Sequence, residues 1–265
     1  MNEAQAWKEV GRWHRRRLAR RVAWLTGLAL LVVVTWQGAE VSVATLVEGL
    51  PLAVEFVGRL FPADWSVLAE MLRSCLETVS IAFLGTLASV ALGLATGMLA
   101  AANLVPAPLA AAVKAALAFI RSIPVILLAL LFVSAVGLGP FPGTLAIAFH
   151  GVGMLGKLYA DEFEAVDPRV LEAVRGTGGG WLATVRYGVL PQALPQLFSL
   201  SLFRFEMNVR EATVLGLVGA GGIGYYIQLY ARAFQYPKVA TMVLAVIAMV
   251  LLVDLAAHQV RQRVL

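Results

Sequence analysis

Apolar segments of helix length, separated by short polar segments, run through most of the chain. A membrane-spanning helix needs about 20 apolar residues. The clearest candidate covers residues 78–102 and contains no charged residue. Five more candidates cover residues 22–36, 122–139, 143–159, 194–218 and 239–257. The pattern predicts an all-α, polytopic membrane protein with about six transmembrane helices.

The composition favours the same fold class. Hydrophobic residues make up 60% of the 265 residues, charged residues only 14%, and the mean hydropathy is +0.81. A soluble domain carries about a quarter charged residues, so the excess apolar surface needs a lipid bilayer around it. The single cysteine, Cys75, excludes an intrachain disulfide and leaves a cysteine-based metal cluster without ligands.

The formal net charge of +5 includes a basic cluster that precedes the first apolar segment. This cluster consists of Lys8, Arg12, Arg15, Arg16, Arg17, Arg20 and Arg21. A block in this place is typical of a topology signal and argues against nucleic acid as a partner. It predicts a cytosolic N-terminus, and six spans bring the C-terminus to the same side.

This topology divides the chain into a basic cytosolic tail, residues 1–21, and one transmembrane domain, residues 22–265. Residues 38–76 form an acidic external loop, and residues 160–191 form a cytosolic loop that carries Arg169, Arg175 and Arg186, in agreement with the excess of Lys and Arg inside. Arg121 is expected at a second cytosolic turn. The first span is interpreted as a retained signal anchor, because no small-residue cleavage site follows it.

Within the external loop, apolar residues recur at helical spacing. They are Leu46, Leu50, Val54, Val57 and Leu60. The pattern predicts an amphipathic helix that lies on the membrane surface, and a short helix packed on its neighbours fits equally well.

The cytosolic loop contains Glu172-Ala173-Val174, then Gly178, then Leu190-Pro191. Glycine allows the chain to turn back without a Cβ penalty, and proline restricts the chain where it returns to the membrane. A short helix, a glycine bend and a second helix would make a firm projection that could receive motion from a separate ATPase. An ordinary helical hairpin is the alternative.

The residue types and spacing of this loop resemble the permease family of ATP-binding-cassette importers that use an external binding protein. Val174 departs from the family, which has a second alanine there. The resemblance implies that Glu172, Ala173, Gly178, Leu190 and Pro191 couple the chain to a cytosolic ATPase. It also implies a periplasmic or lipid-anchored binding protein, a homodimer, the bacterial cytoplasmic membrane, and ATP bound only on the partner, with no cofactor here.

Further segments narrow the resemblance to the phosphonate permeases, a group that includes phosphite and hypophosphite permeases. These segments are 61–66, 121–124, 204–210, 212–216 and 219–224. The implied cargo is a phosphonate or a related phosphorus oxyanion. Another oxyanion, methionine or a metal chelate is the alternative cargo. The sequence contains no paired catalytic residues that would support a membrane enzyme. A passive channel would not need the cytosolic loop.

The fifth span carries four charges, namely Arg204, Glu206, Arg210 and Glu211. Each costs about 2.5–3.5 kcal/mol at a helix centre, so the charges must pair or face water. Glu206 and Arg210 have the spacing of a helical ion pair. Arg204, Asn208 and Glu211 share one face. We expect at least one arginine to face the translocation path and meet an anion, and purely structural pairing is the alternative.

The glycines Gly219, Gly221 and Gly224 match a dinucleotide-binding fingerprint, but the preceding segment is membrane-spanning and no acidic residue follows at the required distance. With Gly222, they are better explained as a flexible bend near a substrate gate. His150 has no second ligand at metal-binding spacing, so no metal site is expected.

Overall fold

The computed structural model describes residues 3–40 and 42–264, and all regular structure within them is helical. The all-α prediction is confirmed. The chain divides into two compact units, Met1–Gly58 and Arg59–Leu265. The predicted division at residue 22 stays a prediction.

The first unit contains α1 (Glu3–Gly38) and most of α2 (Val43–Leu60). The apolar part of α1, Arg20–Gly38, is fully exposed, as expected of a helix that faces lipid. α2 forms where the amphipathic spacing predicted a helix, and its location on a membrane surface stays a prediction. The basic side chains from Lys8 to Arg16 lie outside the described side chains, so the topology signal also stays a prediction.

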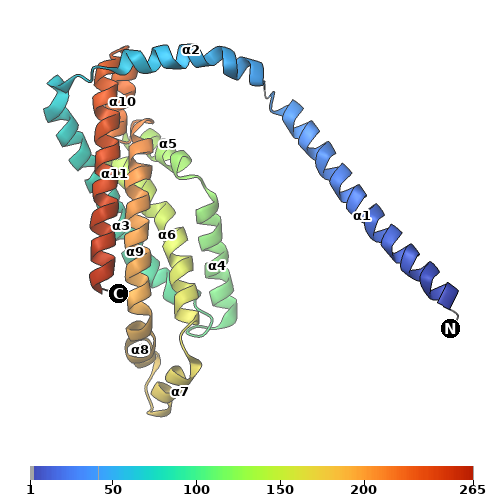
Figure 1. Cartoon of the computed structure of the whole chain (residues 1–265). Helices are drawn as coiled ribbons and strands as arrows, with labels where there is room; N and C mark the ends of the chain where they lie inside the picture. The colour runs from blue at the N-terminus through green and yellow to red at the C-terminus, as the bar shows by residue number, and fades with distance from the viewer. Residues whose placement is uncertain (1–2, 41, 265) are drawn as a thin grey trace. The chain divides into compact units, whose positions relative to one another are not determined.

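The second unit is a helical bundle centred on two helices, α3 (Leu68–Ala100) and α6 (Pro140–Glu164) (Figure 1). Small residues allow their backbones to approach closely. A Cβ added at Gly85 would lie 2.6 Å from the Ile147 side chain, and one at Gly97 would lie 2.9 Å from Tyr159. The predicted spans at 143–159, 194–218 and 239–257 correspond to α6, α9 (Leu190–Gly216) and α11 (Tyr236–Val264).

The helix α3 begins ahead of the predicted span, because Asp64 caps a short 3-10 turn, Trp65–Val67, that leads directly into it. The Asp64 carboxylate accepts a hydrogen bond from the Ser66 backbone N–H at 2.9 Å, and hydrogen bonding to the Ser66 side chain and to this N–H lowers the pKa of Asp64. Residues 68–76 are therefore helical and continuous with the predicted span, and their external location stays a prediction.

The predicted span at 122–139 is also shorter than expected. α5 (Val125–Val136) has only 12 residues and follows α4 (Ala107–Ser122) at a bend of 81°. Pro124 causes the break, since proline cannot continue a helix and restricts Ile123 to an extended conformation. Three described helices are long and apolar enough to span a membrane, or four if this bent pair counts as one span. The count of six stays a prediction.

The remaining helices are short and lie at the two ends of the second unit (Figure 1). α7 (Pro168–Gly176) and α8 (Trp181–Ala183) lie at one end, here named the projecting end. α10 (Ile223–Arg232) lies at the opposite end, packed against α3, α9 and α11.

Candidate functional site

The projecting end is a helix, a bend and a second helical segment, as the sequence predicted. The Asp167 carboxylate accepts a hydrogen bond from the Arg169 N–H and starts α7. Leu171 is buried in the bundle and anchors the helix, whereas Glu172 and Ala173 are exposed. α7 therefore presents the predicted coupling residues to the outside of the unit.

The bend depends on Gly178, whose φ of +83° favours glycine. A Cβ at Gly178 would meet nothing within 4 Å, so the backbone angle, not space, restricts this position. The chain then forms α8 and a π-helical segment, Thr184–Val189, which the sequence did not predict. Leu190 and Pro191 occupy the first turn of α9, where proline is tolerated.

Hydrogen bonds tie the projecting end to the turn that follows α3. The Arg175 guanidinium donates to the Asn103 carbonyl at 3.0 Å, and the Trp181 indole donates to the Leu104 carbonyl at 2.9 Å. Because segments from both sides of the bend are tied to one turn, the projection is attached to the bundle at two points.

Glu164, at the end of α6, joins two further elements at this end. Its carboxylate accepts from the Lys114 ammonium at 2.8 Å and from the Ala102 backbone N–H at 2.6 Å. Desolvation alone would raise the pKa of Glu164, but these hydrogen bonds and the Lys114 charge together hold the pKa below its usual value.

The charges of α9 are paired. Arg204 is 2% exposed, and its two terminal nitrogens donate to the two oxygens of Glu211 at 3.2 and 2.9 Å. Asn208, on the same face, donates to the Thr86 hydroxyl at 2.7 Å. The predicted shared face is therefore present. Arg204 Nε and Asn208 Oδ1 are buried without a hydrogen-bond partner among the described residues.

The predicted pair of Glu206 and Arg210 does not form. Glu206 accepts from Arg261 at 2.8 Å, and Arg210 donates to Asp254 at 2.6 Å. Both partners come from α11, whose polar side chains lie within reach of α9. Glu206 and Arg210 thus each pair with a residue of the neighbouring helix α11 and not with one another.

The predicted glycine bend lies between α9 and α10. Gly219, Gly221 and Gly222 have φ of +88°, +80° and +72°. Gly224 has an ordinary φ but no room, since a Cβ there would lie 2.0 Å from the Thr213 carbonyl oxygen. The bend thus needs glycine for conformation at three positions and for space at the fourth.

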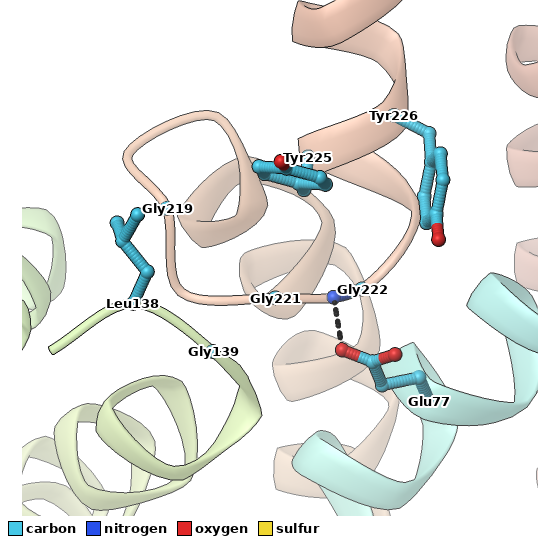
Figure 2. Close-up of a pocket in the computed structure, with 8 residues that line it drawn as sticks. All are labelled: Glu77, Leu138, Gly139, Gly219, Gly221, Gly222, Tyr225 and Tyr226. Carbon is cyan, nitrogen blue, oxygen red and sulfur yellow. Dashed lines mark hydrogen bonds between the residues drawn. The ribbon is translucent and has the colours of Figure 1, made fainter.

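Two consecutive residues of α3 hold this bend from the side. Glu77 Oε1 accepts from the Gly222 N–H at 2.9 Å (Figure 2), and Thr78 Oγ1 accepts from the Ile223 N–H at 2.8 Å. On the other side, the Gly139 N–H donates to the Gly219 carbonyl at 3.0 Å. Glu77 and Thr78 were not predicted as site residues, although a carboxylate next to an uncharged apolar segment could have indicated them.

A pocket of about 220 Å³ opens beside the bend, and Figure 2 shows the residues around it. Its lining consists of Glu77, Leu138, Tyr225 and Tyr226 together with Gly139, Gly219, Gly221 and Gly222. Farther along α10, the Tyr230 hydroxyl donates to Glu70 of α3, and desolvation and this carboxylate raise the pKa of Tyr230 to about 12. α10 is therefore attached to α3 at both of its ends.

His150 lies at the break between α4 and α5, where its Nδ1 is 3.2 Å from the Ile123 carbonyl oxygen. No group of three metal-ligating side chains occurs among the described residues. We therefore interpret His150 as a residue that packs against the break through its contact with Ile123.

Solved structures share this helical arrangement. A chain of the inward-facing MetNI methionine ABC transporter aligns with a TM-score of 0.68 and 22% identity, covering 76% of this chain and 99% of that one. A chain of an amino acid ABC transporter crystallised with histidines aligns with a TM-score of 0.60 and 17% identity, covering 77% and 100%. The fold is that of ABC transporter membrane proteins.

Residues 93–265 match the family described as binding-protein-dependent transport system inner membrane component. This chain belongs to that family. It is a transport subunit of the inner membrane, not an enzyme, and the resemblance found in the cytosolic loop is confirmed.

Relatives with a named cargo cover much of the chain. It is 36% identical to the phosphite transport system permease protein PtxC of Stutzerimonas stutzeri over 94% of this chain and 86% of that protein. It is 38% identical to the phosphate-import permease protein PhnE of Mycolicibacterium smegmatis over 77% and 39%. It is 43% identical to the putative cryptic phosphonate transport system permease protein PhnE2 of Escherichia coli strain K12 over 44% and 97%.

Proposed function

We propose that this chain is the permease through which an ATP-driven importer moves phosphite, a phosphonate or a related phosphorus oxyanion across the inner membrane. The observation that carries the proposal is the 36% identity to a phosphite permease over 94% of the chain. Two chains associate as a homodimer, and they work with a cytosolic ATPase and an external binding protein.

The projecting end is the surface that receives the ATPase. This end has an exposed helix, a bend that needs glycine and two attachments to the bundle. These features suit a part that must transmit force without deforming. In this proposal Glu172 and Ala173 contact the ATPase, Gly178 sets the angle of the bend, and Leu190 and Pro191 fix the return into α9.

The bend at Gly219, Gly221, Gly222 and Gly224 is the gate at the other end. It is held by backbone hydrogen bonds to Glu77, Thr78 and Gly139, which come from two different helices or their connections. A backbone held by so few bonds can be released when those helices separate. The charged face of α9 lies between the two ends, and Arg204 could meet an anion only if Glu211 releases its guanidinium.

Two measurements test the cargo. The partner binding protein should bind phosphite or methylphosphonate more tightly than methionine in calorimetric titrations. The complete importer in proteoliposomes should take up the same compound only with ATP inside. Preference for methionine or a metal chelate would reject the proposed cargo while leaving the importer mechanism intact.

Orientation is tested separately. We propose that both termini and Glu172 are cytosolic, whereas Asp64 and Tyr230 are external. Single cysteines at positions 64, 172 and 230, in a Cys75→Ser background, should react with an impermeant thiol reagent in intact spheroplasts only at 64 and 230. Reaction at 172 but not at 64 would reverse the topology.

A further inference from the structure

Arg121 is an arginine whose charge has no partner in the described part of the chain. It lies at the end of α4, immediately before the break at Pro124, and it is exposed. Its side chain makes no hydrogen bond and no ion pair with any described residue. The sequence had placed Arg121 at a cytosolic turn, where an unpaired arginine would need no explanation.

The packing of α4 against α6 corrects that expectation. A Cβ added at Gly153 would lie 2.9 Å from the Arg121 backbone nitrogen, so these two residues touch. Gly153 is near the middle of α6 (Pro140–Glu164). The remaining 11 residues of α6 extend about 16 Å at 1.5 Å per residue, which places Arg121 well inside the bundle's length.

An unpaired arginine at this depth is costly against lipid. Insertion scales assign about 2.5–3.5 kcal/mol to an arginine at a helix centre, and snorkelling suits arginines nearer the membrane surface. Four basic side chains of these helices are paired, namely Lys114 with Glu164, Arg204 with Glu211, Arg210 with Asp254 and Arg261 with Glu206. Arg121 must therefore face water or an anion that the chain itself does not supply.

The surroundings of Arg121 fit a site that is covered from lipid. The broken helix exposes backbone at membrane depth, which occurs only where a cavity or other protein covers it. α4 ends and α5 begins at this break, so the negative end of the α4 dipole and the positive end of the α5 dipole meet beside Arg121. His150 contacts the break at Ile123 and brings no negative charge.

We propose that Arg121 faces the translocation path and contacts the transported oxyanion as it passes the break between α4 and α5. This inference rests on the proposed function, because it names the residue that meets the cargo. Its planar guanidinium can donate to two oxygens of a phosphorus oxyanion at once, whereas a lysine at this position would act as a point charge.

The first test is uptake of phosphite and methylphosphonate by the complete importer in proteoliposomes, expressed per permease molecule. Arg121→Gln should lower the maximal rate at least about tenfold, and Arg121→Lys should retain an intermediate rate. If the wild-type importer moves neither compound, the proposed function fails. If the wild type moves one of them and Arg121→Gln moves it equally fast, only the role of Arg121 fails.

The second test separates the path from a structural contact. In a Cys75→Ser background, Arg121→Cys should react with a hydrophilic thiol reagent, and a cationic reagent should restore part of the uptake that a neutral one of similar size does not. Phe119→Cys, about 200° away around α4, is the matched control and should stay unreactive. Equal reaction at both positions, or a loss of uptake explained entirely by lower membrane abundance, would overturn the proposal.

Discussion

Glu211 follows Arg204 by two turns of α9, and its two oxygens accept hydrogen bonds from both terminal nitrogens of the Arg204 guanidinium, at 3.2 and 2.9 Å. Arg204 is 2% exposed, and the Glu211 side chain is 21% exposed. The pair therefore lies with its cation inside the bundle and its carboxylate at the edge.

Arg204→Ala should remove most of the folded protein from the membrane. The substitution strands a carboxylate, and breaking a buried ion pair costs about 3–5 kcal/mol. Membrane abundance and thermal unfolding in detergent measure the effect. Replacing both partners, Arg204→Met with Glu211→Gln, should recover much of the abundance because no charge is left unpaired.

Arg210→Ala is the matched control for that experiment. Arg210 is 45% exposed and Asp254 36% exposed, so solvent and side-chain freedom reduce what their ion pair contributes. We expect a clearly smaller loss of abundance than for Arg204→Ala. An equal loss in both variants would contradict the distinction between a buried and an open pair.

Gly178→Val should abolish transport while the protein still inserts. A β-branched residue held at a φ of +83° adds about 1–3 kcal/mol of backbone strain. We expect the backbone to leave this conformation, which changes the direction of the bend. Gly178→Asp should also abolish transport by adding a charge at the ATPase contact, whereas Gly178→Asn tolerates this φ and should retain more activity. ATP-dependent uptake and membrane abundance are measured together.

Gly176→Ala is the control that shows whether any glycine substitution in the projecting end lowers transport. Gly176 ends α7, and a Cβ there would meet nothing within 4 Å. Transport at the wild-type rate is expected for this variant. If Gly178→Val also transports at that rate, the bend does not carry the coupling.

Glu77→Ala should loosen the glycine bend without unfolding the bundle. The substitution removes the acceptor of the Gly222 N–H, a bond to a charged group worth about 1.5–3 kcal/mol. Amide hydrogen exchange at Gly222 and Ile223 should accelerate about tenfold or more. Glu48→Ala, an acidic position on α2, should leave this exchange unchanged, and unchanged exchange in Glu77→Ala would exclude the role given to Glu77.

Glu164 should make stability depend on acid pH. Its pKa is lowered in the folded protein, so its contribution is present above the unfolded value of about 4.5 and is lost as pH falls through the folded value. Glu164→Gln should lower the melting temperature at pH 7 by a few degrees, about 1 kcal/mol, and have little effect near pH 3. A decrease of the same size at both pH values would assign the effect to packing instead of charge.

The sequence predicted those elements that depend only on the residue types within one continuous segment. Apolar segments of sufficient length became α6, α9 and α11, because a helix satisfies the backbone hydrogen bonds of an apolar segment internally. The start of α3 was predicted too late because Glu70, Arg73 and Glu77 interrupt the apolar pattern, although the helix continues through them. The glycine bend at Gly178 was predicted because a positive φ leaves few other residue types.

Features that depend on packing could not be predicted in this way. The partners of Arg210 and Glu206 lie 44 and 55 residues further along the chain, on a helix whose rotation sequence alone does not specify. The depth of Arg121 depends on how α4 packs against α6, and its position at the end of an apolar segment suggested a turn. The hydrogen bonds that Glu77 and Thr78 accept from the glycine bend join residues 145 positions apart in the sequence.

The close packing of α3 on α6 has a mechanical consequence. A Cβ at Gly151 would lie 2.1 Å from Ser89 Oγ and one at Gly156 2.6 Å from Thr96 Oγ1, so α3 packs against α6 where neither position has room for a side chain. α7 follows the last residue of α6 after three residues, and a Cβ at Gly143, near the first residue, would lie 2.7 Å from the Ala220 carbonyl oxygen. If α7 receives the ATPase as proposed, α6 is a single helix that connects this contact to the glycine bend.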